Sequence, residues 1–261
     1  MDVIEAIILG AVQGLTEFLP VSSSGHLQIA KALLGVRIDE NITFDVMLHA
    51  ATVLSTIVVM WRELWRIVCG IFSRRFNDEQ AYVLKIVVSM IPAGVVGVLF
   101  ADKIEELFSS LPFVGAMLLV TAALLTFAYY AKPRQKSDIS FRDAFIIGCA
   151  QAAATMPGLS RSGSTIATGL LLGNRKESVA EFSFIMVIPV ILGKMLLDVT
   201  SGEMAAMSVD AAPLAAGFVA AFVTGAFACK FMIEAVKRGK LIWFAAYCAV
   251  AGAVAIAGSL F

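Results

Sequence analysis

Charged residues are scarce in this chain of 261 residues. Asp, Glu, Lys and Arg together make up 15% of it, whereas hydrophobic residues make up 59%. A soluble domain is typically about a quarter charged and about half apolar. The mean hydropathy is +0.88. The shortage of charge excludes an ordinary soluble domain and indicates an integral membrane protein.

Cysteine and histidine are also sparse. The four cysteines are widely spaced and include no Cys-x-x-Cys pair, so neither a disulfide framework nor a zinc site is indicated. The only histidines are His26 and His49. The formal net charge is zero, and we expect no nucleic-acid partner. The first five residues lack the basic region of a secretory signal, so we expect no cleavable signal.

Long apolar runs are abundant. A helix needs roughly 20 predominantly apolar residues to cross a bilayer. Six segments meet this length: about 42–62, 80–100, 111–131, 178–199, 213–236 and 241–260.

Two further apolar regions, about 3–35 and 141–173, are interrupted by Pro20 and Pro157. The run 22–35 would be about 21 Å long as a helix, which is too short to cross. We therefore predict that each region is a re-entrant hairpin of two half-helices, with its polar turn buried near mid-membrane. The alternative is a helix pair joined by a surface loop.

The two hairpins resemble each other. Residues 22–35 align without gaps to residues 160–173, with Ser-x-Ser-Gly shared at the start. Three spans follow each hairpin, so a single membrane domain, 1–261, divides into repeats of about 1–137 and 138–261. Because three spans are an odd number, the second repeat is inverted. We predict an all-α integral membrane protein with six transmembrane helices and two re-entrant helical hairpins in two inverted-topology repeats.

The loop charges orient this arrangement. Arg37 and Lys103 are the basic loop residues of one face, and thirteen basic residues lie on the other. The larger set is Arg62, Arg66, Arg74, Arg75, Lys132, Arg134, Lys136, Arg142, Arg175, Lys176, Lys237, Arg238 and Lys240. The positive-inside rule therefore places both termini and the mouth of the first hairpin on the outer face.

Each polar turn has the features of an anion site. A half-helix that begins inside the membrane offers free N–H groups and the positive end of its dipole, and Arg161 adds a guanidinium that can hold phosphate oxygens bidentately. We expect these groups to hold a compact anion such as a diphosphate. The other candidate substrate-binding residues are Ser22, Ser24, Gly25, Ser160, Ser162, Gly163 and Ser164. The alternative for Arg161 is a structural ion pair with Glu17.

The first turn also carries acid–base groups. Glu17 follows Gln13 by four residues, so a helix places both on one face, where they could hold a divalent cation such as Mg²⁺ or simply hydrogen-bond each other. His26 is a candidate general base, general acid or nucleophile, and Ser23 a candidate nucleophile. Ser22 alone is explained equally well as a helix N-cap. His49, one turn after Asp45, is explained as a structural polar contact between helices; the alternative is a functional role in which it acts through other residues.

The motifs Gln13-x-x-x-Glu17, Pro20-Val-Ser-Ser-Ser-Gly-His26 and Pro157-Gly-Leu-Ser-Arg-Ser-Gly163 together resemble the undecaprenyl-diphosphate phosphatase family, also called bacitracin-resistance proteins. The resemblance implies hydrolysis of undecaprenyl diphosphate to the monophosphate with a divalent cation (Mg²⁺ or Ca²⁺), which recycles the lipid carrier of bacterial cell-wall synthesis. It also implies a plasma (inner) membrane location.

Carried over by position, the resemblance assigns Glu17 to metal or phosphate, His26 to proton transfer or attack, and Ser23 to attack or phosphate binding. It assigns Arg161 and Ser160 to the diphosphate. Gln13 stands where the family also accepts Glu, which argues against two acidic metal ligands.

Two other functional classes share some of these features. The acid-phosphatase-like lipid phosphatases require a histidine after the arginine motif, and none follows residue 49. An inverted-repeat transporter or flippase for a phosphate-bearing lipid or anion remains the alternative function. The expected partners are a polyprenyl diphosphate and membrane lipids, and a homodimer is left open.

Overall fold

The computed structural model describes residues 1–36, 42–108, 110–131, 136, 138–200 and 210–259. These residues form helices apart from turns and one isolated bridge between Lys136 and Asn174. The helices of the described residues are α1 (Val3–Phe18), α2 (Ser23–Leu34), α3 (Ile42–Val59), α4 (Trp61–Ile71), α5 (Asp78–Leu99), α6 (Ala101–Phe108), α7 (Leu111–Tyr130), α8 (Phe141–Ala153), α9 (Arg161–Leu171), α10 (Lys176–Thr200), α11 (Ala211–Lys237) and α12 (Leu241–Gly258).

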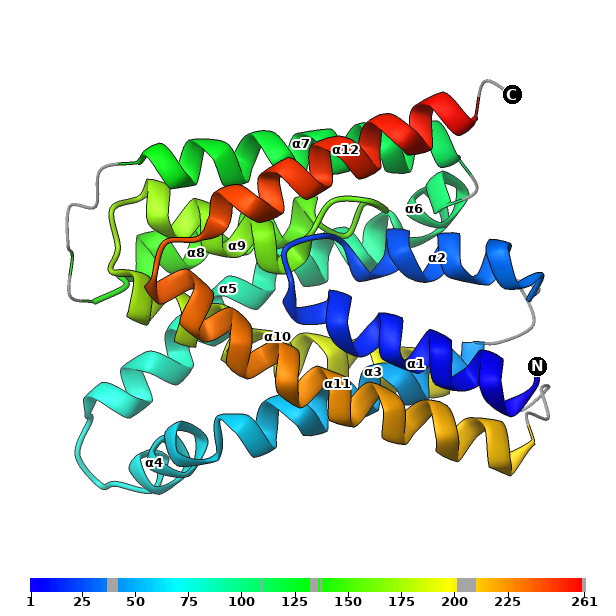
Figure 1. Ribbon diagram of the computed structural model, residues 1–261. Coiled ribbons are helices and arrows are strands. Elements are labelled where there is room, and N and C mark those ends of the chain that lie inside the picture. Colours follow the sequence, from blue (N-terminus) through cyan, green and yellow to red (C-terminus); the bar gives the residue numbers. More distant parts are fainter. Residues whose placement is uncertain (37–41, 109, 132–135, 137, 201–209, 260–261) are drawn as a thin grey trace.

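Five of these helices are long and apolar enough to cross a membrane by themselves, namely α5, α7, α10, α11 and α12. A sixth span is obtained if α3 and α4 are counted together, although the chain bends by 81° between them. The sequence-based segment 42–62 therefore corresponds to α3 and stops near Met60. The architecture is that of an all-α, multi-pass membrane protein (Figure 1).

Four shorter helices form the two interrupted regions. α2 has 12 residues and α9 has 11, so neither is long enough to cross a hydrocarbon core of about 30 Å. α1 ends before Pro20 and α8 ends before Pro157. Ser140 is the N-cap of α8, and its hydroxyl accepts a hydrogen bond of 3.0 Å from the N–H of Asp143. Arg37, Lys132 and Arg134 of the charge tally lie outside the described residues.

Small residues bring the half-helices close to long helices. α1 lies along α11 (Figure 1), and a Cβ atom on Gly10 would lie 2.3 Å from the carbonyl oxygen of Gly217. α8 lies along α5 in the same way, and a Cβ atom on Gly148 would lie 2.3 Å from the carbonyl oxygen of Ser89. Backbones approach this closely where membrane helices pack through small residues. The ends of α1 and α8 are thereby held inside the bundle.

Candidate functional site

The two polar turns lie against each other in the structure. Arg161, at the start of α9, forms an ion pair with Glu17 near the end of α1. The hydroxyl of Ser162 donates a hydrogen bond of 3.2 Å to the carbonyl oxygen of Leu19. A Cβ atom on Gly163 would lie 3.2 Å from Cβ of Pro20. Residues about 140 positions apart in the sequence therefore meet at one place inside the bundle.

Glu17 is the centre of this contact. Its side chain is 2% exposed. Oε1 accepts from Arg161, and Oε2 accepts from Ser23 Oγ at 2.7 Å and from Gln13 Nε2 at 2.9 Å. A buried carboxylate is tolerated when it is both paired and hydrogen-bonded, and Glu17 meets both conditions. The structure thus places Ser23 next to Glu17, which could accept its proton.

Gln13 extends the contact to α3. Its Nε2 lies 3.1 Å from Nδ1 of His49, and the same imidazole nitrogen lies 3.8 Å from Oε2 of Glu17. The amide oxygen Oε1 of Gln13 is buried and has no hydrogen-bond partner among the described residues. Buried polar atoms usually have a partner, so this oxygen is available to a ligand. Within the described part of the chain, no group of three or more His, Cys, Asp or Glu side chains could hold a metal ion.

Both half-helices begin with the same serine arrangement. Ser22 and Ser160 are the N-caps of α2 and α9, and their hydroxyls accept hydrogen bonds from the N–H groups of Gly25 and Gly163. Ser22 has φ +70°, a conformation that non-glycine residues rarely adopt. The hydrogen bond from the N–H of Gly25 confirms that Ser22 is an N-cap. The two starts differ in Arg161, which α9 alone provides at this position.

The other serines of the candidate set hold different positions. Ser24 Oγ lies 3.2 Å from Ser22 Oγ, and Ser162 Oγ lies 3.3 Å from Ser160 Oγ. The hydroxyl of Ser164 is buried without a hydrogen-bond partner among the described residues. The backbone N–H of Ser160 donates to Oγ1 of Thr121 at 3.0 Å, which ties the second turn to α7.

His26 is held by its two ring nitrogens. Nδ1 lies 2.9 Å from the carbonyl oxygen of Ser22, and Nε2 lies 2.6 Å from the hydroxyl of Tyr247 on α12. Because a carbonyl oxygen can only accept, Nδ1 carries the hydrogen and Nε2 accepts from Tyr247. The two rings are stacked with centroids 5.5 Å apart. No sequence motif points to Tyr247, which lies in an apolar helix.

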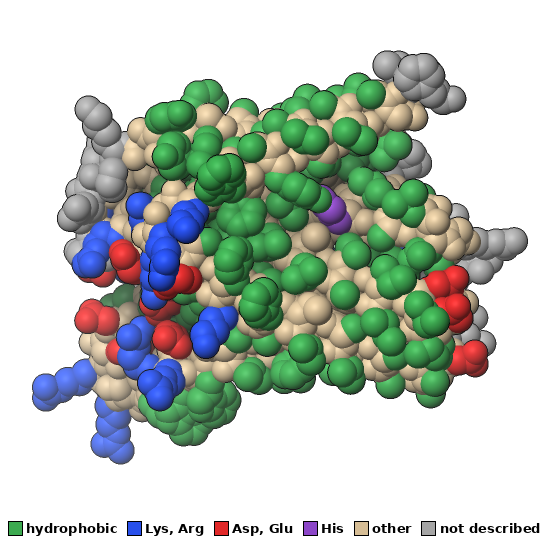
Figure 2. Space-filling model, in the orientation of Figure 1, with side chains coloured by type: hydrophobic (Ala, Val, Ile, Leu, Met, Phe, Trp, Pro, Cys, Tyr) green, Lys and Arg blue, Asp and Glu red, His purple; other side chains and the backbone are tan. Residues whose placement is uncertain are grey.

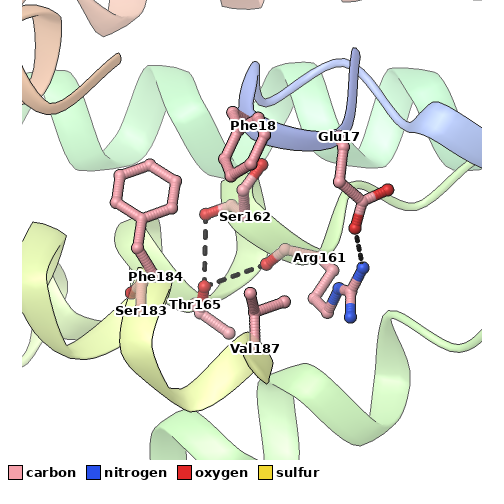
Figure 3. A pocket seen from close by; sticks show the side chains of 8 residues that line it. All are labelled: Glu17, Phe18, Arg161, Ser162, Thr165, Ser183, Phe184 and Val187. Atoms are coloured by element: carbon pink, nitrogen blue, oxygen red, sulfur yellow. Dashed lines mark hydrogen bonds and ion pairs between the residues drawn. The ribbon is translucent and has the colours of Figure 1, made fainter. Parts of the chain in front are cut away.

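A small cavity borders the ion pair. It has room for about one water molecule, with a volume of about 10 Å³. Figure 3 shows Glu17 and Arg161 at one side of it and the rings of Phe18 and Phe184 at the other. Its remaining lining residues are Ser162, Thr165, Ser183 and Val187. The buried hydroxyl of Ser183 on α10 has no hydrogen-bond partner among the described residues, and no motif pointed to it.

Comparisons with known proteins agree with the motif resemblance. A relative from Parabacteroides distasonis named Undecaprenyl-diphosphatase is 61% identical and covers 100% of this chain and 99% of its own length. Relatives with the same name from Bacteroides fragilis and Christiangramia forsetii are 58% and 52% identical, and each match covers 98% of both chains. The family model described as Bacitracin resistance protein BacA matches residues 6–254. The chain therefore belongs to the bacitracin resistance protein BacA family.

Proposed function

We propose that this protein hydrolyses undecaprenyl diphosphate to undecaprenyl monophosphate and inorganic phosphate, and so recycles the lipid carrier of bacterial cell-wall synthesis. The observation that carries the proposal is the junction of Glu17 and Arg161 between two serine-capped helix starts. Full-length relatives at 52–61% identity named Undecaprenyl-diphosphatase support it.

We infer that Arg161 exchanges its partner Glu17 for the diphosphate when the lipid binds. The cavity beside the ion pair holds about one water molecule, so this cavity does not accommodate two phosphates while Glu17 remains on Arg161. A phosphate matches the guanidinium bidentately as a carboxylate does. The diphosphate therefore replaces Glu17 on Arg161, and the two helix starts supply further N–H donors. Glu17 is released to take part in the chemistry.

The reaction joins an oxygen of water to the terminal phosphorus and breaks the bond between that phosphorus and the bridging oxygen. The bridging oxygen keeps the electron pair and remains on the lipid as the monophosphate. Three candidates for the attacking group stay open: Ser23, His26 and a water molecule. Ser23 can pass its proton to Glu17, which already accepts its hydrogen bond at 2.7 Å. Attack by Ser23 or His26 would give a phosphorylated side chain that water then hydrolyses.

A divalent cation such as Mg²⁺ or Ca²⁺ fits this site in part. The unpartnered Oε1 of Gln13 and the carboxylate of Glu17 are hard oxygen ligands of the kind these ions take. The described residues supply no group of three or more His, Cys, Asp or Glu ligands, so Gln13 and Glu17 would hold the cation together with phosphate oxygens. When bound, the cation would neutralise charge on the transferring phosphoryl group.

We further propose that the chain consists of two inverted repeats, 1–137 and 138–261. Many paired positions that are 138 residues apart support this. The N-caps Asp2 and Ser140 form one such pair, as do Ser22 and Ser160. The glycines of positive φ at 35 and 173 form another, and Gly10 and Gly148 make equivalent close contacts with α11 and α5. An inverted pair explains why two helix starts face one site.

The proposed location is the bacterial plasma (inner) membrane, with both termini on the outer, periplasmic side. The start of α1 and the end of α12 lie at the same end of the molecule (Figure 1). On the face drawn in Figure 2, Lys and Arg of the described residues gather at the opposite end, among Asp and Glu. The positive-inside rule favours this orientation. A homodimer is a further proposal.

Phosphate release from a polyprenyl diphosphate by the purified protein in detergent tests the function. We expect release with Mg²⁺ or Ca²⁺ and little after chelation. Glu17→Ala, His26→Ala and Arg161→Ala should each lower the rate by on the order of 100-fold or more. Arg66→Gln, which removes an exposed ion pair with Glu181, is the control and should retain the rate.

The alternative function, an inverted-repeat transporter or flippase for a phosphate-bearing lipid or anion, gives a different result. Under it, the same three variants would stop lipid movement between leaflets in vesicles, while no form of the protein released phosphate. Near-normal phosphate release by both the Glu17 and the Arg161 variants would refute the proposed hydrolase.

A further inference from the structure

The helix α4 leaves the bundle at a sharp angle. The axis of α4 is bent by 81° from that of α3 after Met60. α3 packs along α11, which is long enough to cross the membrane, so a helix nearly perpendicular to α3 lies close to the plane of the membrane. α4 lies at the end of the molecule opposite the termini (Figure 1). Its position is therefore that of a helix at the membrane–water interface.

Contacts with neighbouring elements fix which side of α4 faces outward. Ile67 is buried. At its C-terminal end, Asn77 Nδ2 donates to the carbonyl oxygen of Gly70 at 2.9 Å, and Gln80 Nε2 donates to that of Ile71 at 2.9 Å. Arg66 pairs with Glu181 of α10 at 3.1 Å. These contacts attach one side of α4 to the bundle, so the opposite side of α4 faces outward.

The outward side is an aromatic stripe. Trp61, Trp65, Val68 and Phe72 recur at helical spacing and are all exposed, with both tryptophans 55% exposed. The indole rings of Trp61 and Trp65 are stacked, with centroids 5.6 Å apart. Tryptophan is enriched at membrane interfaces because its ring is apolar and its N–H remains hydrated.

Arginines without carboxylate partners lie beside this stripe. Arg62, Arg74 and Arg75 are exposed, and none of them forms an ion pair with another described residue. Two of the acidic neighbours are partly buried: Glu63 lies one turn before the buried Ile67, and the side chain of Glu79 packs against Gly70. At this corner, basic side chains stand next to apolar surface (Figure 2).

We propose that α4 and the turn after it form a binding surface for an anionic phospholipid of the leaflet at the basic end. The stripe Trp61, Trp65, Val68 and Phe72 enters the acyl region, and Arg62, Arg74 and Arg75 contact the phosphate-bearing headgroups. The charge of these arginines selects an anionic headgroup over a zwitterionic one. The surface is separate from the Glu17–Arg161 site, and the proposal does not depend on hydrolysis.

Tryptophan fluorescence of the full chain in lipid vesicles tests this surface. Trp243 is the only other tryptophan, so in the Trp243→Phe variant all tryptophan emission comes from Trp61 and Trp65 of α4. Brominated phosphatidylglycerol or brominated phosphatidylcholine is mixed at equal fraction into otherwise identical vesicles. A basic residue near an anionic surface favours it by on the order of fivefold, so we expect clearly stronger quenching by the brominated phosphatidylglycerol. Raising the salt to 1 M should reduce the difference.

The triple variant Arg62→Gln, Arg74→Gln, Arg75→Gln should make the two lipids quench equally. A matched variant with the same loss of charge at the same end, Arg142→Gln, Lys237→Gln, Lys240→Gln, should keep the preference. Equal quenching by both lipids in the arginine-containing chain would overturn the proposal, and so would a preference unaffected by salt. Absence of quenching by either lipid, with cross-linking of two chains through α4, would instead assign this face to a second copy.

Discussion

Glu17 and Arg161 illustrate how one contact can serve two states of a site. The sequence left open whether Arg161 binds phosphate or pairs with Glu17, and the structure contains the pair. Removing one partner of a buried pair costs on the order of 3–5 kcal/mol, so an empty site needs the carboxylate to neutralise the guanidinium. Under the proposed function, this pair neutralises Arg161 in the apolar bundle until a phosphate replaces Glu17.

Tyr247 is the residue whose role sequence reasoning missed. Its hydroxyl hydrogen-bonds His26 Nε2 at 2.6 Å and its ring stacks on the imidazole. Loss of one such bond is worth about 1 kcal/mol, so we expect Tyr247→Phe to lower kcat about fivefold to tenfold and to leave KM within about twofold. Steady-state phosphate release measures both constants.

The control for Tyr247 is Tyr129→Phe, which changes an exposed tyrosine on α7 and should alter neither constant. If Tyr247→Phe raised KM and left kcat unchanged, Tyr247 would contribute to lipid binding and would not position His26.

At the scale of helices, the contact between α1 and α11 sets the place of Glu17. Gly10→Ala puts a methyl group 2.3 Å from the carbonyl oxygen of Gly217, so the helices must separate. Overpacking of this kind typically costs about 1–3 kcal/mol, and we expect a lower midpoint of thermal unfolding in detergent together with slower phosphate release.

Gly94→Ala in α5 is the matched control, because its Cβ atom would meet nothing within 4 Å. This variant should unfold at or slightly above the wild-type temperature, since alanine favours the helix. Equal midpoints for the Gly10 and Gly94 variants would mean that the close contact does not limit stability.

The helix pattern could be predicted from the sequence where composition alone decides it. Apolar length identified α5, α7, α10, α11 and α12, and the polar turns with their prolines identified α1, α2, α8 and α9. α4 was not predicted, because its apolar stripe of Trp61 and Trp65 merges with the end of α3 in a hydropathy profile. Tyr247 and Ser183 reach the site through tertiary packing, and no local sequence motif predicts these contacts.

At the scale of the whole molecule, the prediction concerns the orientation of the chain in the membrane. If both termini lie outside, a cysteine at the C-terminal end of α12 should react with a membrane-impermeant maleimide on intact spheroplasts. We expect labelling of Ser259→Cys and none of Ser73→Cys, which follows α4, in a chain whose four native cysteines are replaced by alanine. Both should be labelled after the membrane is opened. The reverse pattern on intact cells would contradict the proposed orientation.

The central claim is that a diphosphate takes the place of Glu17 on Arg161. It is tested most directly by the affinity of purified protein for a polyprenyl methylenediphosphonate, a substrate analogue that cannot be hydrolysed, in the presence of a chelator. Glu17→Gln removes the competing carboxylate, so it should bind the analogue about tenfold more tightly than the wild type, equivalent to about 1.4 kcal/mol. Glu181→Gln, which alters a carboxyl group outside the site, should bind as the wild type does. Equal or weaker binding by the Glu17→Gln variant would contradict the exchange.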